Sequence, residues 1–292
     1  ETGFVQQARD FRAEAILFGA PHPLTGAIRR LQTELVVPVG VLCHGAEITI
    51  PAVVPGLRTW LRRTLRRADA LFTVSHYTQG KVNRLTGREV TWIGAGVDVD
   101  NFIPAAEPPG NDPPIVGCVS RLVPRKGQHR LIAAAQRLRE RGTEVELLII
   151  GKGRLEARLR RLAERSGVSV RFEIDVPWSQ LPNLYQSMDV FCMPCRSRWG
   201  GLEVEGLGLV FLEAAAAGLP VLAGSSGGSP ETVIPGETGF VVHSVNDICD
   251  GLELLLEDRD AAHQIGAKGR CRVVEEYVWD RVVARLDDGF RS

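Results

Sequence analysis

The sequence predicts an α/β protein in which two Rossmann-like domains face a cleft. Two observations carry this prediction. Short apolar runs alternate with amphipathic helical stretches along the chain, a pattern typical of parallel sheets covered by helices on both faces. A segment with five prolines at 104–114 separates two series of such runs and is typical of an interdomain linker. With 292 residues the chain is long enough for two modest cores.

The first domain, predicted over residues 1–107, holds the shorter series of strands. We expect about four, and their residues are 15–19, 36–44, 70–75 and 90–93. A Rossmann-like domain normally has more strand–helix units, so this domain is predicted to be truncated at its N-terminal side. The chain also begins at Glu1 and not at methionine, which agrees with a missing natural start.

The second domain is predicted over residues 108–275 and holds the longer series. Six strands are expected, enough for a complete Rossmann-like sheet, at residues 115–120, 146–151, 169–174, 190–194, 220–223 and 239–242. The segment 276–292 is predicted to form a C-terminal helix that packs back on the first domain, because its amphipathic stretch 276–290 follows the second sheet.

Composition excludes several classes of partner. Lysine plus arginine equal aspartate plus glutamate, so a nucleic-acid partner is not expected. No apolar run approaches the roughly 18 residues of a membrane span, and the first residues lack the apolar stretch of a signal peptide, so we expect a cytoplasmic protein. The abundance of arginine, alanine, glycine and valine is typical of a GC-rich, actinobacterial source.

Six scattered cysteines are predicted to be mostly buried free thiols. Cys192 and Cys195 have the spacing of a metal-binding pair, but no second pair of ligands is nearby, so no metal site is predicted.

A glycine- and glutamate-rich stretch at 200–213 follows a predicted strand and runs into a helix. The backbone of Gly206, Leu207 and Gly208 can present N–H groups to an anion at the helix N-terminus, as expected of a diphosphate site. Eight helical steps place Glu205 and Glu213 within roughly 80° of one helical face, where they can accept hydrogen bonds from sugar hydroxyls. The alternative is two solvated glutamates.

Two cations follow the first strand of the second domain, where doubly wound folds bind ligands. Arg121 and Lys126 can both reach a phosphate and offset the charge of a departing diphosphate. The alternative is surface charge on a turn. A second glycine-rich loop at 224–231 is a weaker candidate for ligand contact.

His44 ends a strand of the first domain that runs toward the same cleft, where it can donate or accept a hydrogen bond. A structural histidine is the alternative. A different class of function, an NAD-dependent oxidoreductase, is suggested by the glycines after the strand at 146–151. It is disfavoured because Glu156 occupies the third glycine position of the dinucleotide fingerprint.

Taken together, these motifs resemble family-4 retaining glycosyltransferases and, within them, the PimB-type phosphatidylinositol mannoside mannosyltransferases. The strings that carry the resemblance are SRLVPRKGQ at 120–128, GGLEVEGLGLVFLEAAAAGLP at 200–220, GGSPETV at 227–233 and GETGFVV at 236–242. It continues more faintly through LFGAPHPL at 17–24, HGAE at 44–47, SHYT at 75–78 and GVDVDNF at 96–102.

The resemblance implies a GT-B fold and the transfer of a hexose with retention of configuration. Mannose from GDP-mannose is the implied donor sugar, a lipid-linked or glycan hydroxyl is the implied acceptor, and no metal or other cofactor is expected. Glu205 is implied to lie by the donor sugar and Glu213 by the ribose. Arg121 and Lys126 are implied to hold the diphosphate, and His44 to face the reacting sugar and the acceptor.

Two departures from the family pattern accompany the resemblance. Ala46 stands where many relatives have a second histidine, so acceptor recognition is expected to differ there. The family's opening strand and glycine-rich loop have no counterpart before Glu1. The alternative function is therefore a catalytically impaired, nucleotide-sugar-binding fragment or homologue.

A basic amphipathic stretch at 57–67 suggests a peripheral membrane contact at the inner face of the plasma membrane. Leu57, Trp60, Leu61 and Leu65 form one helical stripe. Five arginines surround it, at positions 58, 62, 63, 66 and 67. The alternative is a helix packed on the core with a solvated basic face.

Overall fold

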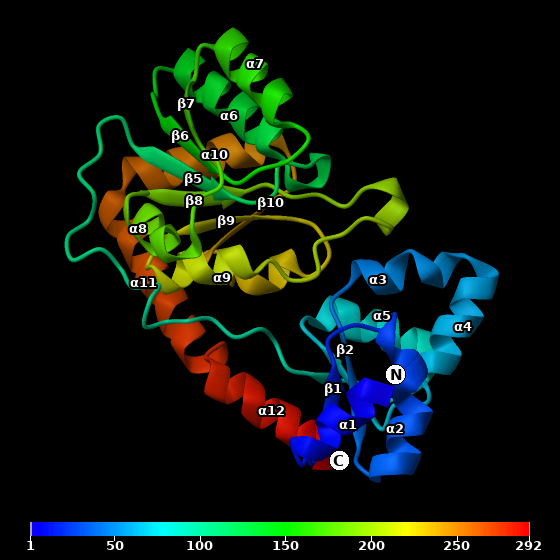
Figure 1. The fold of residues 1–292 in the computed structure, drawn as a ribbon. Helices are drawn as coiled ribbons and strands as arrows, with labels where there is room; N and C mark the ends of the chain where they lie inside the picture. Colours follow the sequence, from blue (N-terminus) through cyan, green and yellow to red (C-terminus); the bar gives the residue numbers. More distant parts are fainter. Residues whose placement is uncertain (1, 292) are drawn as a thin grey trace.

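The computed structural model describes residues 2–291 as two parallel sheets with helices on both faces (Figure 1). This confirms the predicted α/β class and the two Rossmann-like units. The first sheet has the order β1-β2-β3-β4, with β1 at Ile16–Phe18, β2 at Val39–Cys43, β3 at Ala70–Thr73 and β4 at Thr91–Trp92. Each of these strands lies within a range predicted from apolar runs.

The second sheet has the order β10-β9-β8-β5-β6-β7 and is also parallel. Its strands are β5 (Ile115–Val119), β6 (Glu146–Ile150), β7 (Ser169–Glu173), β8 (Val190–Met193), β9 (Val221–Gly224) and β10 (Gly239–Val242). The order reverses beside β5, and in doubly wound sheets ligands bind outside the carboxyl ends of the strands at such a point. The loop after β5 carries Arg121 and Lys126.

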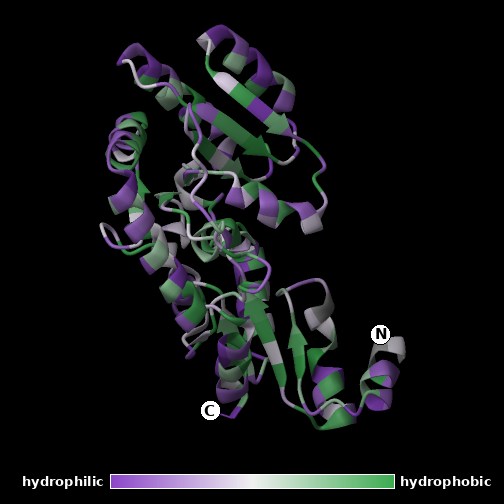
Figure 2. Ribbon diagram, turned by 90° about the vertical axis from the view of Figure 1, so that its left-hand side faces the viewer, coloured by the Kyte–Doolittle hydropathy of each residue, from purple (hydrophilic) through white to green (hydrophobic). Residues whose placement is uncertain are grey.

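The helices of the second sheet lie in two layers (Figure 1). One layer contains α6 (Gln128–Glu140), α7 (Glu156–Ser166) and α10 (Val245–Glu257), and the other contains α8 (Leu181–Gln186), α9 (Leu209–Ala216) and α11 (Arg259–Glu276). Both central strands, β5 and β8, are buried along almost their whole length, as expected for continuous apolar runs between helices. Figure 2 shows the visible strands as mainly hydrophobic and the helices as mixed.

Within residues 2–291, the first unit contains five further helices. They are α1 (Thr2–Asp10), α2 (Ile28–Leu35), α3 (Ala46–Thr49), α4 (Pro55–Leu65) and α5 (His76–Thr86). The first unit also contains the short 3-10 turns η1 (Leu24–Ala27) and η2 (Pro51–Val53). The second unit contains the 3-10 turns η3 (Pro124–Lys126), η4 (Trp178–Gln180), η5 (Trp199–Gly201) and η6 (Ser229–Thr232). Ser75 caps α5 by accepting a hydrogen bond from the Thr78 N–H, 3.2 Å away.

The last helix, α12 (Trp279–Arg291), packs on the first sheet (Figure 1). Phe72 of β3 and Phe290 of α12 have ring centroids 5.0 Å apart, and Val282 joins the same apolar cluster. The predicted helical stretch 276–290 is interrupted, because the Tyr277 carbonyl accepts a hydrogen bond from the Val97 N–H at 2.8 Å. The proposed domain limits at 107/108 and 275/276 stay predictions.

The cysteines agree with the expectation of buried thiols for five of the six. Cys271, on α11, is exposed. Within residues 2–291, no helix is both long and apolar enough to cross a bilayer.

Candidate active site between the two sheets

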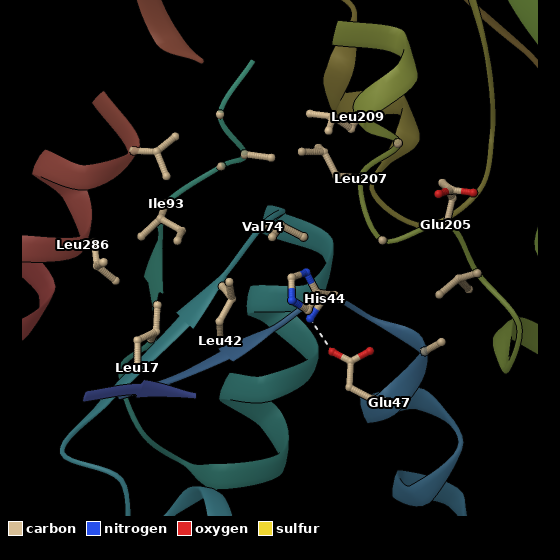
Figure 3. Close-up of a pocket in the computed structure, with 18 of the residues that line it drawn as sticks. Leu17, Leu42, His44, Glu47, Val74, Ile93, Glu205, Leu207, Leu209 and Leu286 are labelled. Carbon is tan, nitrogen blue, oxygen red and sulfur yellow. Dashed lines mark hydrogen bonds between the residues drawn. The ribbon is translucent and has the colours of Figure 1, made fainter. Parts of the chain in front are cut away.

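A cavity of about 550 Å³ lies between the carboxyl ends of the first sheet, the loop before α9 and helix α12 (Figure 3). Among the predicted site residues, His44, Glu205, Gly206, Leu207 and Gly208 line this cavity. Its remaining wall is mostly apolar and includes Leu17, Leu42, Val74, Ile93, Leu209 and Leu286. Arg121, Lys126 and Glu213 are not among the described residues that line it.

Glu205 is held by two cations from the loop after β5. Its carboxylate lies 2.7 Å from Lys126 Nζ and forms an ion pair with Arg125. Its backbone N–H donates to Ser226 Oγ at 3.0 Å. Glu205 and Lys126 are both buried, so each needs the other to offset the cost of removing a charge from water. The site therefore places one carboxylate and two cations at a single point of the cleft.

The prediction that Glu205 and Glu213 share a helical face is wrong. Helix α9 begins at Leu209, four residues after Glu205. Gly208 precedes it with φ of +93°, a left-handed conformation that a helix cannot continue through. Glu205 therefore lies on the loop, and only Glu213 belongs to the helix.

Glu213 lies in a buried environment on α9. Tyr185 Oη donates a hydrogen bond of 2.9 Å to its carboxylate. Burial raises the pKa of the Glu213 carboxyl above its usual value, and the Tyr185 hydrogen bond opposes part of that increase. A hydroxyl-rich ligand that reached Glu213 would supply further hydrogen bonds to a poorly solvated carboxylate.

His44 lies at the end of β2 and points into the cavity (Figure 3). Its Nε2 lies 2.8 Å from the Gly19 carbonyl oxygen, and its backbone N–H donates to the Glu47 carboxylate. The backbone of Gly206 packs so closely on His44 that a Cβ at position 206 would collide with the His44 carbonyl. Gly206 thus permits the two sheets' loops to meet, a role that the sequence did not indicate.

Arg121 differs from Lys126 in its surroundings. It is exposed, and its side chain forms no hydrogen bond or ion pair with any residue in the described part of the chain. Arg125, which sequence reasoning passed over, instead contacts both Glu205 and Glu203, the latter at 3.9 Å. The available signal was its place beside Lys126 in the 120–128 string.

The glycine-rich loop after β9 contacts the site through both its backbone and the Ser226 side chain. The Gly228 N–H donates to the Glu205 carbonyl at 3.0 Å. Glu231, three residues later, accepts hydrogen bonds from the backbone N–H groups of His76 and Tyr77, each at 2.7 Å. These groups lie at the N-terminus of α5, where a carboxylate is stabilised by the helix dipole. Glu231 thereby links the second unit to the first, and no sequence signal identified it.

Comparisons with known proteins agree with this architecture. A family model described as glycosyl transferases group 1 matches residues 99–272. This span includes Glu156 and its glycine-rich neighbourhood, so the oxidoreductase alternative has no support. The structure is similar to a sucrose-phosphate synthase from Thermosynechococcus elongatus, with a TM-score of 0.81 and 23% identity over 99% of this chain and 75% of the other. It is also similar to Anabaena Alr3699/HepE in complex with UDP, with a TM-score of 0.83 and 19% identity over 98% and 80% of the two chains. These two structural similarities show the GT-B fold.

Two relatives are more similar in sequence. The chain is 40% identical to the GDP-mannose-dependent alpha-(1-6)-phosphatidylinositol monomannoside mannosyltransferase of Mycobacterium tuberculosis, over 96% of this chain and 76% of that protein. It is 36% identical to the GDP-mannose-dependent monoacylated alpha-(1-6)-phosphatidylinositol monomannoside mannosyltransferase of Corynebacterium glutamicum, over 97% and 78% of the two chains. The chain therefore belongs to the group 1 glycosyltransferases, and it is a hexosyltransferase.

Proposed function

We propose that this enzyme transfers mannose from GDP-mannose to a hydroxyl group of a phosphatidylinositol-based, lipid-linked acceptor with retention of configuration. The observation that carries the proposal is the position of Glu205, held by Arg125 and Lys126 at the edge of a cavity that His44 enters from the other side. The names of the two mannosyltransferases similar to this chain support the choice of donor and acceptor class.

The donor diphosphate is proposed to bind against Lys126, Arg121 and the loop of Gly206, Leu207 and Gly208. Lys126 already contacts Glu205 at the edge of the cavity, and the exposed guanidinium of Arg121, which has no partner in the described part of the chain, is able to turn toward a phosphate. Helix α9 begins directly after Gly208, so its N-terminal N–H groups add a partial positive charge. Together these groups stabilise the charge that develops on the departing diphosphate.

The two glutamates are proposed to bind hydroxyl groups at separate places along the donor. Glu205, beside the diphosphate cations, accepts from the transferred sugar. Glu213, deeper under the loop, accepts from the ribose while keeping its Tyr185 hydrogen bond. The acceptor hydroxyl then attacks the anomeric carbon from the side of the leaving group, and a donor phosphate oxygen takes the hydroxyl proton.

His44 is proposed to orient the sugar and the acceptor. The Gly19 carbonyl oxygen contacts Nε2 and so orients the ring. The other ring nitrogen, Nδ1, is not engaged by this carbonyl. Correct placement of two reactants contributes a large part of the barrier lowering in group transfer, roughly 7–11 kcal/mol at its upper end.

A membrane contact through the outer side of α4 is proposed to bring the enzyme to its lipid-linked acceptor at the inner face of the plasma membrane. Leu61 and Leu65 pack in the core, whereas Leu57 and Trp60 are 47% and 43% exposed. The five arginines of this stretch, at positions 58, 62, 63, 66 and 67, are all exposed. The exposed side therefore combines apolar contact with positive charge, as peripheral helices on anionic lipid do.

The test is a transfer assay with GDP-mannose and phosphatidylinositol mannoside, with the product's anomeric configuration read by nuclear magnetic resonance. We expect a product of retained configuration and competition by GDP that exceeds competition by UDP or ADP. Transfer only to a soluble glycan, or inversion of the anomeric centre, would contradict the proposal.

A further inference from the structure

A second cavity, of about 640 Å³, opens on the second unit outside the active site. We call it the arginine crevice, and its lining includes His129 of α6 and five arginines, which are Arg158, Arg161 and Arg165 of α7, and Arg196 and Arg198 of the loop after β8. Pro124 lines this crevice, whereas its neighbour Arg125 lines the active-site cavity. The single turn η3 therefore separates the two cavities.

The charges of the arginine crevice are largely uncompensated. Its lining includes no aspartate or glutamate among the described residues. The side chains of four lining arginines are exposed and form no ion pair within residues 2–291; these are Arg158, Arg161, Arg165 and Arg196. Of the lining arginines, only Arg198 has a carboxylate partner among the described residues, and this partner is Glu203 at 3.0 Å. Several guanidinium groups that converge without counter-charge create a strong positive potential, which favours a multiply charged anion.

The side chain of His129 lies in the same positive potential. Burial lowers the pKa of His129, and the charges of Arg196, Arg130 and Arg158 lower it further. The floor of the crevice is apolar, formed by Leu155, Leu159 and Leu162. Planar guanidinium forks over an apolar floor suit phosphate groups that are attached to a larger amphipathic molecule.

The loop after β8, which carries Arg196 and Arg198 of the arginine crevice, also contacts the first unit. Arg198 lies over the ring of Trp199 at 4.8 Å, and the Trp199 side chain is 64% exposed. The same loop reaches the first unit, where Thr49 Oγ1 donates to the Leu202 carbonyl at 2.7 Å (Figure 1). Ile50 and Val53, which follow Thr49 on the way to α4, are also exposed. Exposed tryptophan and aliphatic side chains between basic groups are typical of a surface that contacts a bilayer interface.

We propose that the arginine crevice binds the phosphate headgroups of an anionic lipid surface, so that the membrane contacts both units of the enzyme. This inference rests on the proposed lipid-linked acceptor and extends the α4 contact to the donor-binding half. Holding both units against one surface would keep the cleft at the depth of the acceptor headgroup.

The test uses the complete chain with Arg158→Gln, Arg161→Gln and Arg196→Gln combined. A control variant removes three exposed cations elsewhere, through Arg84→Gln, Lys268→Gln and Arg281→Gln. Binding to vesicles of phosphatidylcholine containing phosphatidylinositol is measured by flotation at low and high salt. We expect the crevice variant to lose at least about tenfold in vesicle partitioning at low salt, and the control variant to lose little. GDP affinity and melting temperature should be unchanged in both variants.

The alternatives give different results. Equal vesicle partitioning of crevice and control variants would overturn the inference. If the variant with Arg58→Gln, Arg62→Gln and Arg63→Gln loses partitioning while the crevice variant keeps it, the contact is confined to α4, which also overturns the inference and leaves the proposed transfer intact. Calorimetry with inorganic pyrophosphate tests whether the crevice binds a soluble anion instead. If the crevice variant no longer binds pyrophosphate but still binds vesicles, the crevice is a site for a soluble anion and the inference is overturned. Failure of mannose transfer is read separately, in a detergent-dispersed acceptor assay without vesicles.

Discussion

Lys126 Nζ lies 2.7 Å from a carboxylate oxygen of Glu205, so the proposed diphosphate-binding cation is already paired before a donor arrives. An incoming diphosphate must share Lys126 with this carboxylate. The proposed role of Glu205 in binding the transferred sugar gives this pair two functions: it stabilises the buried charges of the free enzyme and places the sugar beside its leaving group.

The first prediction separates these functions with Glu205→Gln. The amide keeps the shape and one acceptor oxygen but removes the negative charge that competes for Lys126 and Arg125. We expect GDP to bind at least as tightly as to the wild type, while the transfer rate falls about 30- to 100-fold, because a charged hydrogen bond of roughly 2–3 kcal/mol to the sugar is weakened. Calorimetry and initial rates measure the two effects. Near-wild-type kinetics would remove Glu205 from the proposed site.

The second prediction compares Arg121→Ala with Lys126→Ala. Each substitution should weaken GDP binding by about 1.5–3 kcal/mol, the usual range for a charged hydrogen bond. Only Lys126→Ala should lower the melting temperature of the free enzyme, because it leaves the buried Glu205 with one cation fewer, whereas the Arg121 side chain has no hydrogen-bond or ion-pair partner within residues 2–291. Titration calorimetry and thermal unfolding of both variants decide this. Unchanged diphosphate affinity in both would argue against the pair.

The third prediction concerns Glu213 and pH. Because burial raises the pKa of this carboxyl, its protonated form is favoured by the fold. Its contribution to stability is therefore present at acid pH, below the ordinary value of 4.5, and is lost as the pH rises through the raised pKa. Glu213→Gln should be more stable than the wild type at pH about 7, and this difference should shrink toward pH about 4.5.

The same variant should bind GDP-mannose less well, since the ribose would lose a charged acceptor. Thermal unfolding across this pH range, with calorimetry at neutral pH, measures both changes. If the difference in melting temperature between Glu213→Gln and the wild type does not change with pH, ionisation of Glu213 does not cause that difference. Glu253→Gln, at a carboxylate that pairs with Arg141 outside the active-site cavity, is the control.

The fourth prediction tests the link between the two units. Glu231→Ala removes two hydrogen bonds from the N–H groups of His76 and Tyr77. We expect a larger radius of gyration in small-angle scattering and a lower transfer rate, because the cleft is held closed less well and each charged hydrogen bond contributes about 1.5–3 kcal/mol. Glu231→Gln keeps one acceptor oxygen, so its radius of gyration and transfer rate should lie between those of the wild type and of Glu231→Ala. Identical scattering and rates for all three forms would exclude a role in closure.

The amino-acid sequence by itself determined the architecture. Strands such as β5 and β8 are continuous apolar runs bounded by turn residues, and burial on both faces of a parallel sheet leaves such runs no other stable environment. The motifs also identified the family, and they placed His44, Glu205 and Gly206 at one cavity, because loops at the carboxyl ends of parallel strands converge.

Only the tertiary structure decided which side chains meet. The prediction that Glu205 and Glu213 share a helical face was wrong because Gly208, between them, adopts a left-handed backbone conformation that ends the helix before Glu205. Arg125 became a partner of Glu205, and Glu231 a cap for α5, through contacts between residues 80 and more than 150 positions apart in the chain. Secondary-structure propensity and hydrophobic periodicity describe only neighbouring residues in the chain. These ion pairs and caps form between distant residues, because burial in the folded cleft makes an unpartnered charge or N–H group costly.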